Sequence, residues 1–391
     1  MVPYYKIINK KKRWVTILGD LLGSLLFFPR ILMRGQKEID PAKIQSILVI
    51  RTAYIGDVIM TIPILKPIRD RFPNAKISFL SSHSARGILE QNPHVDEVLG
   101  YDAFWFHDAP KNQLFPFLKS IRQRHFDLVI EARADIRDIA MLVLPIKARY
   151  KVSYGVGGGH YLLTHMVPYE KLSHKIHYHL DMVRHLGCNT PNEEDPTTAV
   201  TWNLNPSDTH RQAADNILKK HGITGDFVAI HPGSRMALKR WPNDRFALLS
   251  DWIMAKWQMP VVVVGSPEEK ELVGDIAGRM QNKPVDLAGQ FGLMELAAVL
   301  DRATMMICND SAPMHVAAAM DTPIVAIFGP SSSIETGPFC SHHRVVEIDA
   351  HCRATCDEGT CLDSNVHHCI QELHVERLEE AVTDLMEEVK S

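Results

Sequence analysis

The chain has 391 residues, of which 46% are hydrophobic and 23% charged, and its net charge is −3. This composition is typical of a folded globular protein and excludes a disordered or collagen-like chain. The absence of a strongly basic body argues against nucleic acid as a partner. The length exceeds one ordinary hydrophobic core and predicts two domains of about 150 to 200 residues each.

Residues 1–40 are predicted to form a separate basic and apolar arm, with eight Lys or Arg against three acidic residues. The apolar stretch at 14–29 contains Asp20, two glycines and Pro29. It is shorter than the ~20 apolar residues that span a bilayer, and it lacks a signal-peptide cleavage site. Two interpretations remain open, namely a helix at an anionic membrane surface and a helix packed on the protein body.

From residue 45, short β-rich runs alternate with segments of helical spacing, which predicts parallel sheets covered by helices on both faces. A polar stretch at 189–200 interrupts the alternation and is the expected linker. We therefore expect Rossmann-like domains at 41–195 and 196–391, with ligands beyond the carboxyl ends of the strands. The expected strands are 45–51, 75–80, 96–101, 126–132, 226–233, 260–266, 283–289, 303–310 and 322–330, and the expected helices include 58–72, 243–257 and 293–302.

The first polar motif is RTAYIGDVIMTIP at 51–63, directly after a buried strand. Gly56 is expected to form a tight turn, and Asp57 then stands near a helix N-terminus. Aspartate is a preferred N-cap, so Asp57 is either a cap or a catalytic carboxylate.

The second motif is HPGSRMALKRWP at 231–242. Gly233 and Ser234 offer backbone N–H groups after a strand, and Lys239 offers an ammonium, the combination that a diphosphate requires. The spacing differs from a P-loop. The alternative is that Arg235, Lys239 and Arg240 form a solvated rim.

The third motif is CNDSAPMHVAAAM at 308–320. Asp310 and Ser311 stand where a helix is expected to begin, so nearby N–H groups can hold phosphate oxygens while Asp310 meets sugar hydroxyls. In the alternative, Asp310 is an N-cap and His315 is a hydrogen-bonded, half-buried histidine.

Together, IGDV, HPGS…KRWP and DSAPMH resemble glycosyltransferase family 9, the heptosyltransferases of bacterial lipopolysaccharide, over about residues 45 to 385. The resemblance implies an α/β GT-B fold, in which two Rossmann-like domains face a cleft. The acceptor belongs to the N-terminal domain and a nucleotide-diphosphate sugar to the C-terminal one. It further implies an inverting, metal-independent transfer without a cofactor, from ADP-heptose to a lipid-linked saccharide.

The resemblance also assigns roles to individual residues. Asp57 matches the general base, and Lys239 matches the lysine that contacts the donor phosphates. Asp310 matches the residue that holds the donor sugar, and Glu268 is our candidate for the ribose contact. The complete expected donor-binding set is Gly233, Ser234, Lys239, Glu268, Asp310, Ser311, Ala312 and His315.

The sequence departs from the family pattern at two positions. Ala312 stands where the family usually has glycine, and Tyr54 stands where serine is frequent, which leaves the acceptor open. The expected location is cytoplasmic, peripheral to the inner face of the bacterial membrane. Two rival functions are a nucleotide-sugar epimerase and a non-catalytic membrane scaffold of the same architecture. The joint presence of Asp57, Lys239 and Asp310 argues against the scaffold.

A cysteine cluster near the C-terminus is a weak candidate for a metal site. Four ligands is the number that zinc prefers, but the spacing lacks the paired C-x2-C form, and reduced thiols in a surface loop are the alternative. The cluster consists of Cys352, Cys356, Cys361 and Cys369, with His351, His367 and His368 nearby.

A second group of histidines lies at 174–185. His177 and His179 would point to different faces of a helix, so shared metal ligation is not expected. A role for one of these histidines toward the acceptor stays open.

Overall fold

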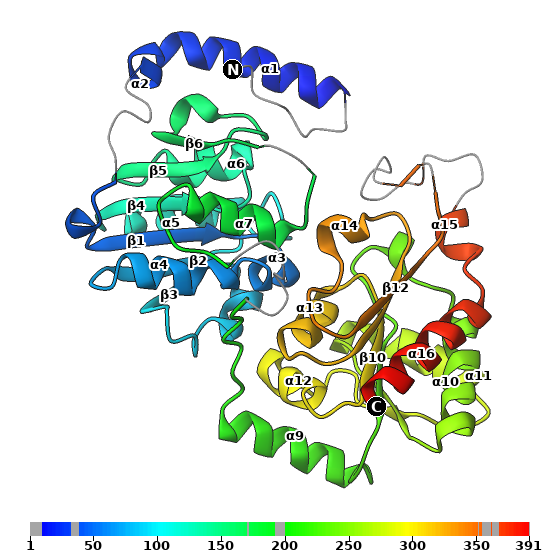
Figure 1. Ribbon diagram of the computed structural model, residues 1–391. Helices are drawn as coiled ribbons and strands as arrows, with labels where there is room; N and C mark the ends of the chain where they lie inside the picture. The colour runs from blue at the N-terminus through cyan, green and yellow to red at the C-terminus, as the bar shows by residue number, and fades with distance from the viewer. Residues whose placement is uncertain are drawn as a thin grey trace. The chain divides into compact units, whose positions relative to one another are not determined.

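The computed structural model describes residues 10–32, 39–169, 172–191, 200–350, 352–353, 361 and 367–390 (Figure 1). The chain divides into two compact units. The first holds the described residues up to 191 together with 200–202, and the second begins at Asn203.

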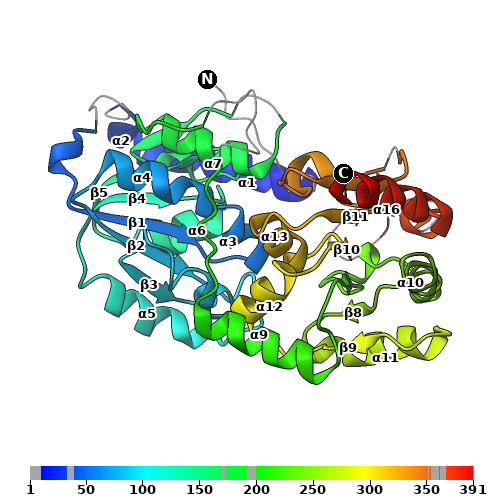
Figure 2. The same cartoon turned by 60° about the horizontal axis from the view of Figure 1, so that its bottom comes forward.

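The first unit contains, in its described part, a six-stranded parallel sheet in the order β3-β2-β1-β4-β5-β6. Helices α4 and α7 lie on one side of the sheet and α5 on the other (Figure 2). The strands are β1 (Ser46–Arg51), β2 (Lys76–Ser81), β3 (Glu97–Gly100), β4 (Phe126–Glu131), β5 (Ala148–Tyr154) and β6 (His165–Val167). The helices are α1 (Lys10–Leu26), α2 (Phe28–Leu32), α3 (Ile55–Ile59), α4 (Leu65–Arg71), α5 (Leu114–Ile121), α6 (Ile136–Asp138) and α7 (Lys175–Arg184).

The helix expected over 58–72 is divided into two pieces. Helix α3 ends at Ile59, a 3-10 turn covers Ile62–Ile64, and α4 follows. Pro63 lies in this turn, where its missing N–H is not needed for an α-helical hydrogen bond. The prediction of one continuous helix was therefore wrong.

Helix α1 lies beside the turn His160–Leu162 (η6), at the β6 edge of the first sheet (Figure 1). The buried Asp20 accepts hydrogen bonds from the Gly159 N–H at 2.8 Å, and its other oxygen is 2.9 Å from Nδ1 of His160. Phe27 stacks on Tyr161 with the ring centroids 5.6 Å apart. One face of α1 is therefore packed on the first unit.

The second unit repeats this architecture in its described part, with the parallel strand order β12-β11-β10-β7-β8-β9. Helices α10, α11 and α16 cover one face and α9, α12 and α13 the other (Figure 2). The strands are β7 (Val228–His231), β8 (Val261–Val263), β9 (Val285–Asp286), β10 (Met305–Asn309), β11 (Ile324–Phe328) and β12 (His343–Glu347). The helices are α9 (Asp208–Lys220), α10 (Asn243–Trp257), α11 (Lys270–Arg279), α12 (Leu293–Leu300), α13 (Ala312–Ala319), α14 (Ser333–Thr336), α15 (His368–Gln371) and α16 (Val375–Lys390).

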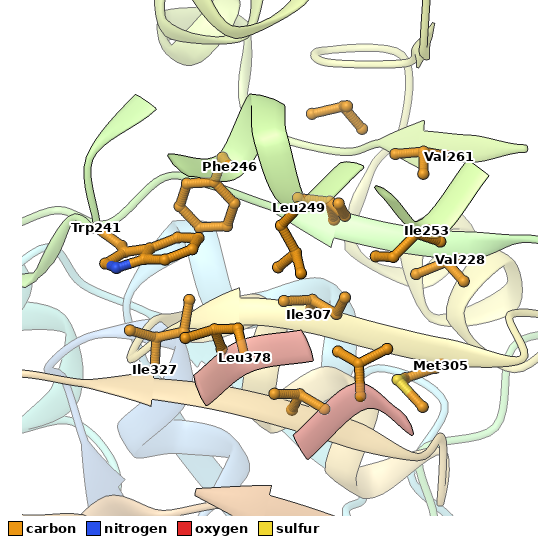
Figure 3. Packing of buried hydrophobic residues seen from close by; sticks show 14 of the residues in the cluster. Val228, Trp241, Phe246, Leu249, Ile253, Val261, Met305, Ile307, Ile327 and Leu378 are labelled. Atoms are coloured by element: carbon orange, nitrogen blue, oxygen red, sulfur yellow. The ribbon is translucent and has the colours of Figure 1, made fainter. Parts of the chain in front are cut away.

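The core of the second unit lies between its strands and the helices α10, α11 and α16 (Figure 3). Trp241 and Phe246 pack edge to face with their ring centroids 5.1 Å apart. The Trp241 indole N–H donates to the Leu373 carbonyl at 2.7 Å, so its one polar group is satisfied despite burial. This tryptophan fixes the loop that carries Lys239 and Arg240.

Both sheets have the strand order 3-2-1-4-5-6 when numbered within their own unit, which is the Rossmann order. The prediction of two Rossmann-like units is thus confirmed. In each sheet the order reverses beside its first strand, between β1 and β4 and between β7 and β10. Ligands of such sheets bind beyond the carboxyl ends of the strands at this reversal.

Candidate active site

Asp57 lies just beyond the carboxyl end of β1, at the point where the strand order of the first sheet reverses. Its Oδ1 accepts a hydrogen bond from Nη2 of Arg51 at 2.7 Å and lies 3.3 Å from Nζ of Lys175. Its Oδ2 lies 3.7 Å from Nη1 of Arg133. Three cations from β1, the loop after β4, and the first turn of α7 thus meet one carboxylate.

The charges around Asp57 determine its ionisation. Burial raises the pKa of its carboxyl group, but the charges of Lys175, Arg51 and Arg133 outweigh burial and hold that pKa well below the usual value. Asp57 is therefore a carboxylate at any physiological pH.

Asp57 is not an N-cap, so the capping interpretation was wrong. The N-cap of α3 is Tyr54, in extended backbone conformation, and Asp57 is the third residue of the helix. Gly56 is also helical rather than the centre of a tight turn. A carboxylate in the first helical turn still faces the positive end of the helix dipole, which adds to the effect of the three cations.

Aromatic side chains lie beside Asp57 and the three cations around it. The ring of Tyr54 meets Phe106 and His107 edge-on, with ring centroids 6.5 and 5.8 Å apart. The guanidinium carbon of Arg133 lies 4.0 Å from the centroid of Phe106. Tyr54, one of the two residues at which the sequence departs from the pattern of the family that it resembles, is therefore part of the surroundings of Asp57.

Glu131, at the end of β4, positions the loop that carries Arg133. Its carboxyl oxygens accept the N–H groups of Arg133 and Ala134 at 2.9 and 2.8 Å and the hydroxyl of Ser153 at 2.6 Å. Burial and the nearby Asp138 raise the pKa of Glu131. Sequence reasoning missed this residue because a glutamate that ends a strand run carries no motif of its own.

Of the two central histidines of α7, His179 is buried against the Asp57 cluster. Its Nδ1 is 2.8 Å from the Met60 carbonyl and its Nε2 is 2.9 Å from the Ala132 carbonyl. Burial and the charge of Arg51 lower the pKa of His179 to about 3, so the neutral ring donates to one carbonyl at a time. His177 is half-buried, on a different face of the helix.

In the second unit, Asn309 joins the loops that follow β7 and β10. Its side-chain amide donates to the Pro232 carbonyl at 2.6 Å and accepts the backbone N–H of Trp241 at 3.1 Å. Both ends of the motif at 231–242 are thereby tied to the end of β10. The two motifs that the sequence predicted to bind donor consequently meet at the strand reversal of the second sheet.

Lys239 and Asp310 form the central ion pair of this second site. Nζ of Lys239 is 2.6 Å from Oδ2 of Asp310. Burial raises the pKa of Asp310, but the charge and hydrogen bond of Lys239 outweigh it and lower that pKa. The buried Ser234 hydroxyl donates to the Asp310 backbone carbonyl at 3.1 Å. Lys239 is thus not part of a freely solvated rim.

Asp310 precedes the N-cap of α13, which is Ser311, so the interpretation of Asp310 as a cap was wrong. The Ser311 side chain makes no capping hydrogen bond, and Ala312 is the first helical residue. His315, on the same helix, is buried rather than half-buried.

Glu268 and Glu269 differ sharply in position. Glu268 is exposed and forms a hydrogen bond with Ser266, whereas Glu269 is half-buried with its Oε2 3.2 Å from Nε2 of His231. A Cβ atom on Gly233 would lie 1.8 Å from Oε1 of Glu269, so a larger residue there would require the Glu269 carboxylate to move. The carboxylate that reaches this site is therefore that of Glu269.

Sequence reasoning missed both Glu269 and His231. The sequence Ser266-Pro-Glu-Glu269 carries the S-x-x-E pattern of a capping box, and the Glu269 side chain does accept the Ser266 N–H at 2.8 Å. That pattern identifies Glu269 as the residue that turns back toward β8. His231 is the first residue of the second motif, and no signal in the sequence separates it from a structural histidine.

The cysteine cluster yields no metal site among the residues that the structure describes. Cys352 and Cys369 are buried and pack in one small cluster with Ala350, and Cys361 is half-buried. Cys356 lies outside the described residues.

Comparisons with known proteins agree with these motifs. The family model described as "Glycosyltransferase family 9 (heptosyltransferase)" matches residues 114–366. The chain is 30% identical over 302 residues to lipopolysaccharide heptosyltransferase 3 of Escherichia coli K12, covering 73% of this chain and 83% of that protein. It is 22% identical over 310 residues to the lipopolysaccharide core heptosyltransferase OpsX of Haemophilus influenzae, covering 78% and 84%.

Solved structures share the fold. The crystal structure of a family 9 glycosyltransferase from Veillonella parvula matches with a TM-score of 0.75 at 24% identity, covering 90% of this chain and 99% of that one. The E. coli heptosyltransferase WaaC with ADP-2-deoxy-2-fluoro heptose matches with a TM-score of 0.66 at 17% identity, covering 87% and 99%. With its two Rossmann-like units the chain has the GT-B fold, and it belongs to glycosyltransferase family 9, the heptosyltransferases.

Proposed function

We propose that this glycosyltransferase moves heptose from ADP-heptose onto a lipopolysaccharide core or related lipid-linked saccharide, with inversion and without a metal ion. The observation that carries the proposal is the ionised Asp57, which lies beyond the end of β1 and is surrounded by three cations. A carboxylate that takes a proton from an acceptor hydroxyl allows that hydroxyl to attack the anomeric carbon directly. A single direct displacement inverts the configuration at that carbon.

The low pKa of Asp57 makes it a weak base before the reaction begins. Such a base is effective when proton transfer accompanies departure of the leaving group, because the acceptor hydroxyl becomes more acidic as its new bond forms. We therefore propose that Asp57 accepts the proton late, as the glycosidic bond forms. Lys175 is partly exposed and would then be able to turn toward an acidic acceptor.

The second unit supplies the donor site in this proposal. Lys239 meets the diphosphate, the N–H groups at the start of α13 hold phosphate oxygens, and Asp310 holds the sugar. Gly233, Ser234, Ala312 and His315 complete the proposed site. Glu269 is a better candidate than Glu268 for the ribose hydroxyls because its carboxylate reaches the site. The charge of Lys239 stabilises the departing diphosphate, a task that needs no bound cation.

The names of the relatives support a heptose donor and a lipopolysaccharide acceptor. The structure of the E. coli enzyme with a fluorinated ADP-heptose further supports ADP-heptose as donor. The decisive experiment incubates the protein with ADP-heptose and with other nucleotide sugars, with and without a lipid-linked core saccharide, and determines the product anomer by NMR. Transfer with inversion supports the proposal, acceptor-free epimerisation supports the rival isomerase, and no reaction with any nucleotide sugar supports a scaffold.

We also propose that α1 and α2 rest on an anionic membrane surface. The side of α1 opposite the buried Asp20 exposes large apolar side chains, and Lys11, Lys12 and Arg13 are exposed at one end of the helix. Both interpretations of the arm thus find support, since one face packs on the first unit and the other is free to meet lipid. The exposed apolar residues are Trp14, Val15, Leu18, Leu21, Leu22, Leu25, Leu26, Phe28 and Leu32.

This surface fits peripheral rather than spanning association. No helix in the described part of the chain is long and apolar enough to cross a bilayer. An apolar helix face with cationic residues at its end suits the boundary between lipid headgroups and acyl chains. A lipid-linked acceptor would place this face at the inner side of the bacterial cytoplasmic membrane.

A further inference from the structure

His231 links two groups that the proposed function assigns to the donor. Its buried ring lies between Ser311, with Nδ1 3.0 Å from Oγ, and Glu269, with Nε2 3.2 Å from Oε2. His231 ends β7, Ser311 opens α13, and Glu269 follows β8. Because the ring is almost fully covered, His231 acts through its two partners and is a positioning residue.

The hydrogen-bond partners fix the proton on Nε2. Burial raises the pKa of Glu269, but its hydrogen bonds with His231 and with the Ser266 N–H act against burial and lower that pKa, so the carboxylate is ionised and accepts only. Its Oε2 also accepts the Ser266 N–H at 2.8 Å. An ionised carboxylate requires a donor opposite it, so Nε2 of His231 carries a hydrogen.

The state of Nδ1 then decides what Ser311 offers to a ligand. If Nδ1 is bare, it accepts the Ser311 hydroxyl hydrogen, and the serine presents only lone pairs to its surroundings. If Nδ1 carries a proton, it donates to the serine oxygen, and the hydroxyl hydrogen is free. Phosphate oxygens are acceptors, so only the second arrangement lets Ser311 donate to a diphosphate while it keeps its hydrogen bond with His231.

We propose that binding of the donor's diphosphate places a second proton on His231, which turns the Ser311 hydroxyl outward as a hydrogen-bond donor to phosphate. This inference rests on the proposed function. The proton comes from solvent to Nδ1 and returns to solvent when the nucleotide leaves, and no covalent bond changes. The resulting imidazolium is held by Glu269 on its other side.

A second proton on His231 adds positive charge to the donor site. Lys239 is already paired with Asp310, so this pair adds little net charge before the ligand arrives. A positive charge on His231 therefore supplements the site when two phosphates enter it.

Other titratable side chains lie near His231 or its partners. The charge of Arg240 lowers the pKa of Glu269, and the charge of His315 lowers the pKa of Asp310. Cys308 is the register neighbour of His231 on β10, and burial raises its pKa so that it stays a neutral thiol. The charged partner directly opposite the His231 ring is thus Glu269.

Calorimetry of ADP binding in buffers with different ionisation enthalpies tests this proposal, because it counts the protons taken up. At about pH 8 a free histidine is largely neutral, so linked protonation appears as net uptake. We expect the wild-type protein to take up a measurable fraction of a proton per ADP. Affinity for ADP should also rise as the pH falls toward neutrality.

Two variants distinguish proton uptake by His231 on ADP binding from a purely structural role of His231. Ser311→Ala leaves His231 and Glu269 in place but should abolish proton uptake and weaken ADP binding roughly tenfold. His231→Asn places an amide donor near the serine without a titrating group, so it should bind ADP with no uptake. His221→Asn, at an exposed position after α9, is the matched control and should retain both uptake and affinity.

The outcomes distinguish this proposal from the proposed function. ADP binding without proton uptake in the wild-type protein, or equal uptake in wild type and Ser311→Ala, would overturn the protonation of His231 and leave the donor site intact. Failure to bind ADP, UDP, GDP or CDP would overturn the donor site and this proposal together. Loss of affinity in His231→Asn with unchanged uptake would reduce His231 to a structural role.

Discussion

The guanidinium of Arg51 lies 2.7 Å from the carboxylate of Asp57, and both side chains are almost fully buried. Removing one member of such a pair leaves an uncompensated buried charge, which typically costs about 3 to 5 kcal/mol. Here Lys175 and Arg133 moderate the loss when Arg51 is removed. Removal of the Asp57 charge instead leaves three cations facing one another.

The first prediction concerns Asp57→Asn. The amide keeps the shape of the carboxylate but cannot accept the acceptor's proton, so turnover should fall by ~10² to 10⁴. ADP affinity should be unchanged, because the proposed donor residues belong to the second unit. Single-turnover assays and calorimetry measure the two quantities. Near-wild-type turnover would show that Asp57 serves only to balance charge.

The second prediction concerns pH. A base must be ionised, so the rate falls only when the pH drops below the pKa of Asp57, which its cations hold well below 3.8. Arg51→Met removes one cation and raises this pKa, so the acid limb of the pH–rate profile should move to higher pH. Arg245→Met, in the second unit, is a control that should leave this limb in place. An unshifted limb in Arg51→Met would mean that another group controls it.

The same linkage applies to stability. Because the folded pKa of Asp57 is depressed, its stabilising contribution is present above its unfolded value near 3.8 and is lost as the pH falls through the folded pKa. The free energy of unfolding should therefore differ less between neutral and acidic pH in Arg51→Met than in the wild-type protein. Urea unfolding at several pH values measures this effect.

The third prediction concerns Lys239→Ala. Loss of the ammonium should weaken ADP binding by roughly tenfold or more, and turnover should also fall because charge on the diphosphate grows during departure. The buried Asp310 is left without its partner, so some loss of stability should accompany the change. Lys220→Ala, at the exposed end of α9, is the control. Equal ADP affinity in the two variants would contradict the phosphate role of Lys239.

The fourth prediction tests the exposed face of α1. The double variant Leu18→Ser/Leu25→Ser should weaken binding to anionic vesicles about 30-fold, equivalent to roughly 2 kcal/mol of lost apolar burial. Binding of the wild-type protein should also weaken at high salt, because Lys11, Lys12 and Arg13 act through screened charge. Vesicle sedimentation measures both effects.

Phe115→Ser/Leu248→Ser is the matched control, since these two side chains are equally apolar and exposed but lie on α5 and α10. Comparable losses in both double variants would mean that α1 has no special role at the membrane. Transfer to a short, water-soluble acceptor should be unaffected in either variant.

The strands that position the site were predictable because they are continuous apolar runs, as parallel strands buried on both faces must be. Strands β5, β6 and β12 were not predicted. β5 and β12 carry Arg, Lys or Glu among their apolar residues, and β6 has three residues. Strands β6 and β12 lie at sheet edges, where burial imposes less of a pattern.

The motifs predicted the elements of the site but not its contacts. Asp57 was identified from its place after a strand, yet its partners Arg133 and Lys175 lie far away in sequence, and only the sheet topology brings them to it. We propose Glu269 in place of Glu268 for the ribose contact because a 3-10 turn directs the two side chains differently, and periodicity in the sequence cannot resolve so short a turn.

Helix α1 is held to the first unit by buried hydrogen bonds through Asp20. If its exposed face rests on a bilayer, these bonds fix the height of Asp57 above the lipid. A loose tether would let the site reach acceptors of many sizes, whereas a fixed height selects those whose reactive hydroxyl stands at that distance. Acceptor choice would then depend on how much saccharide the lipid already carries, as well as on the side chains around Asp57.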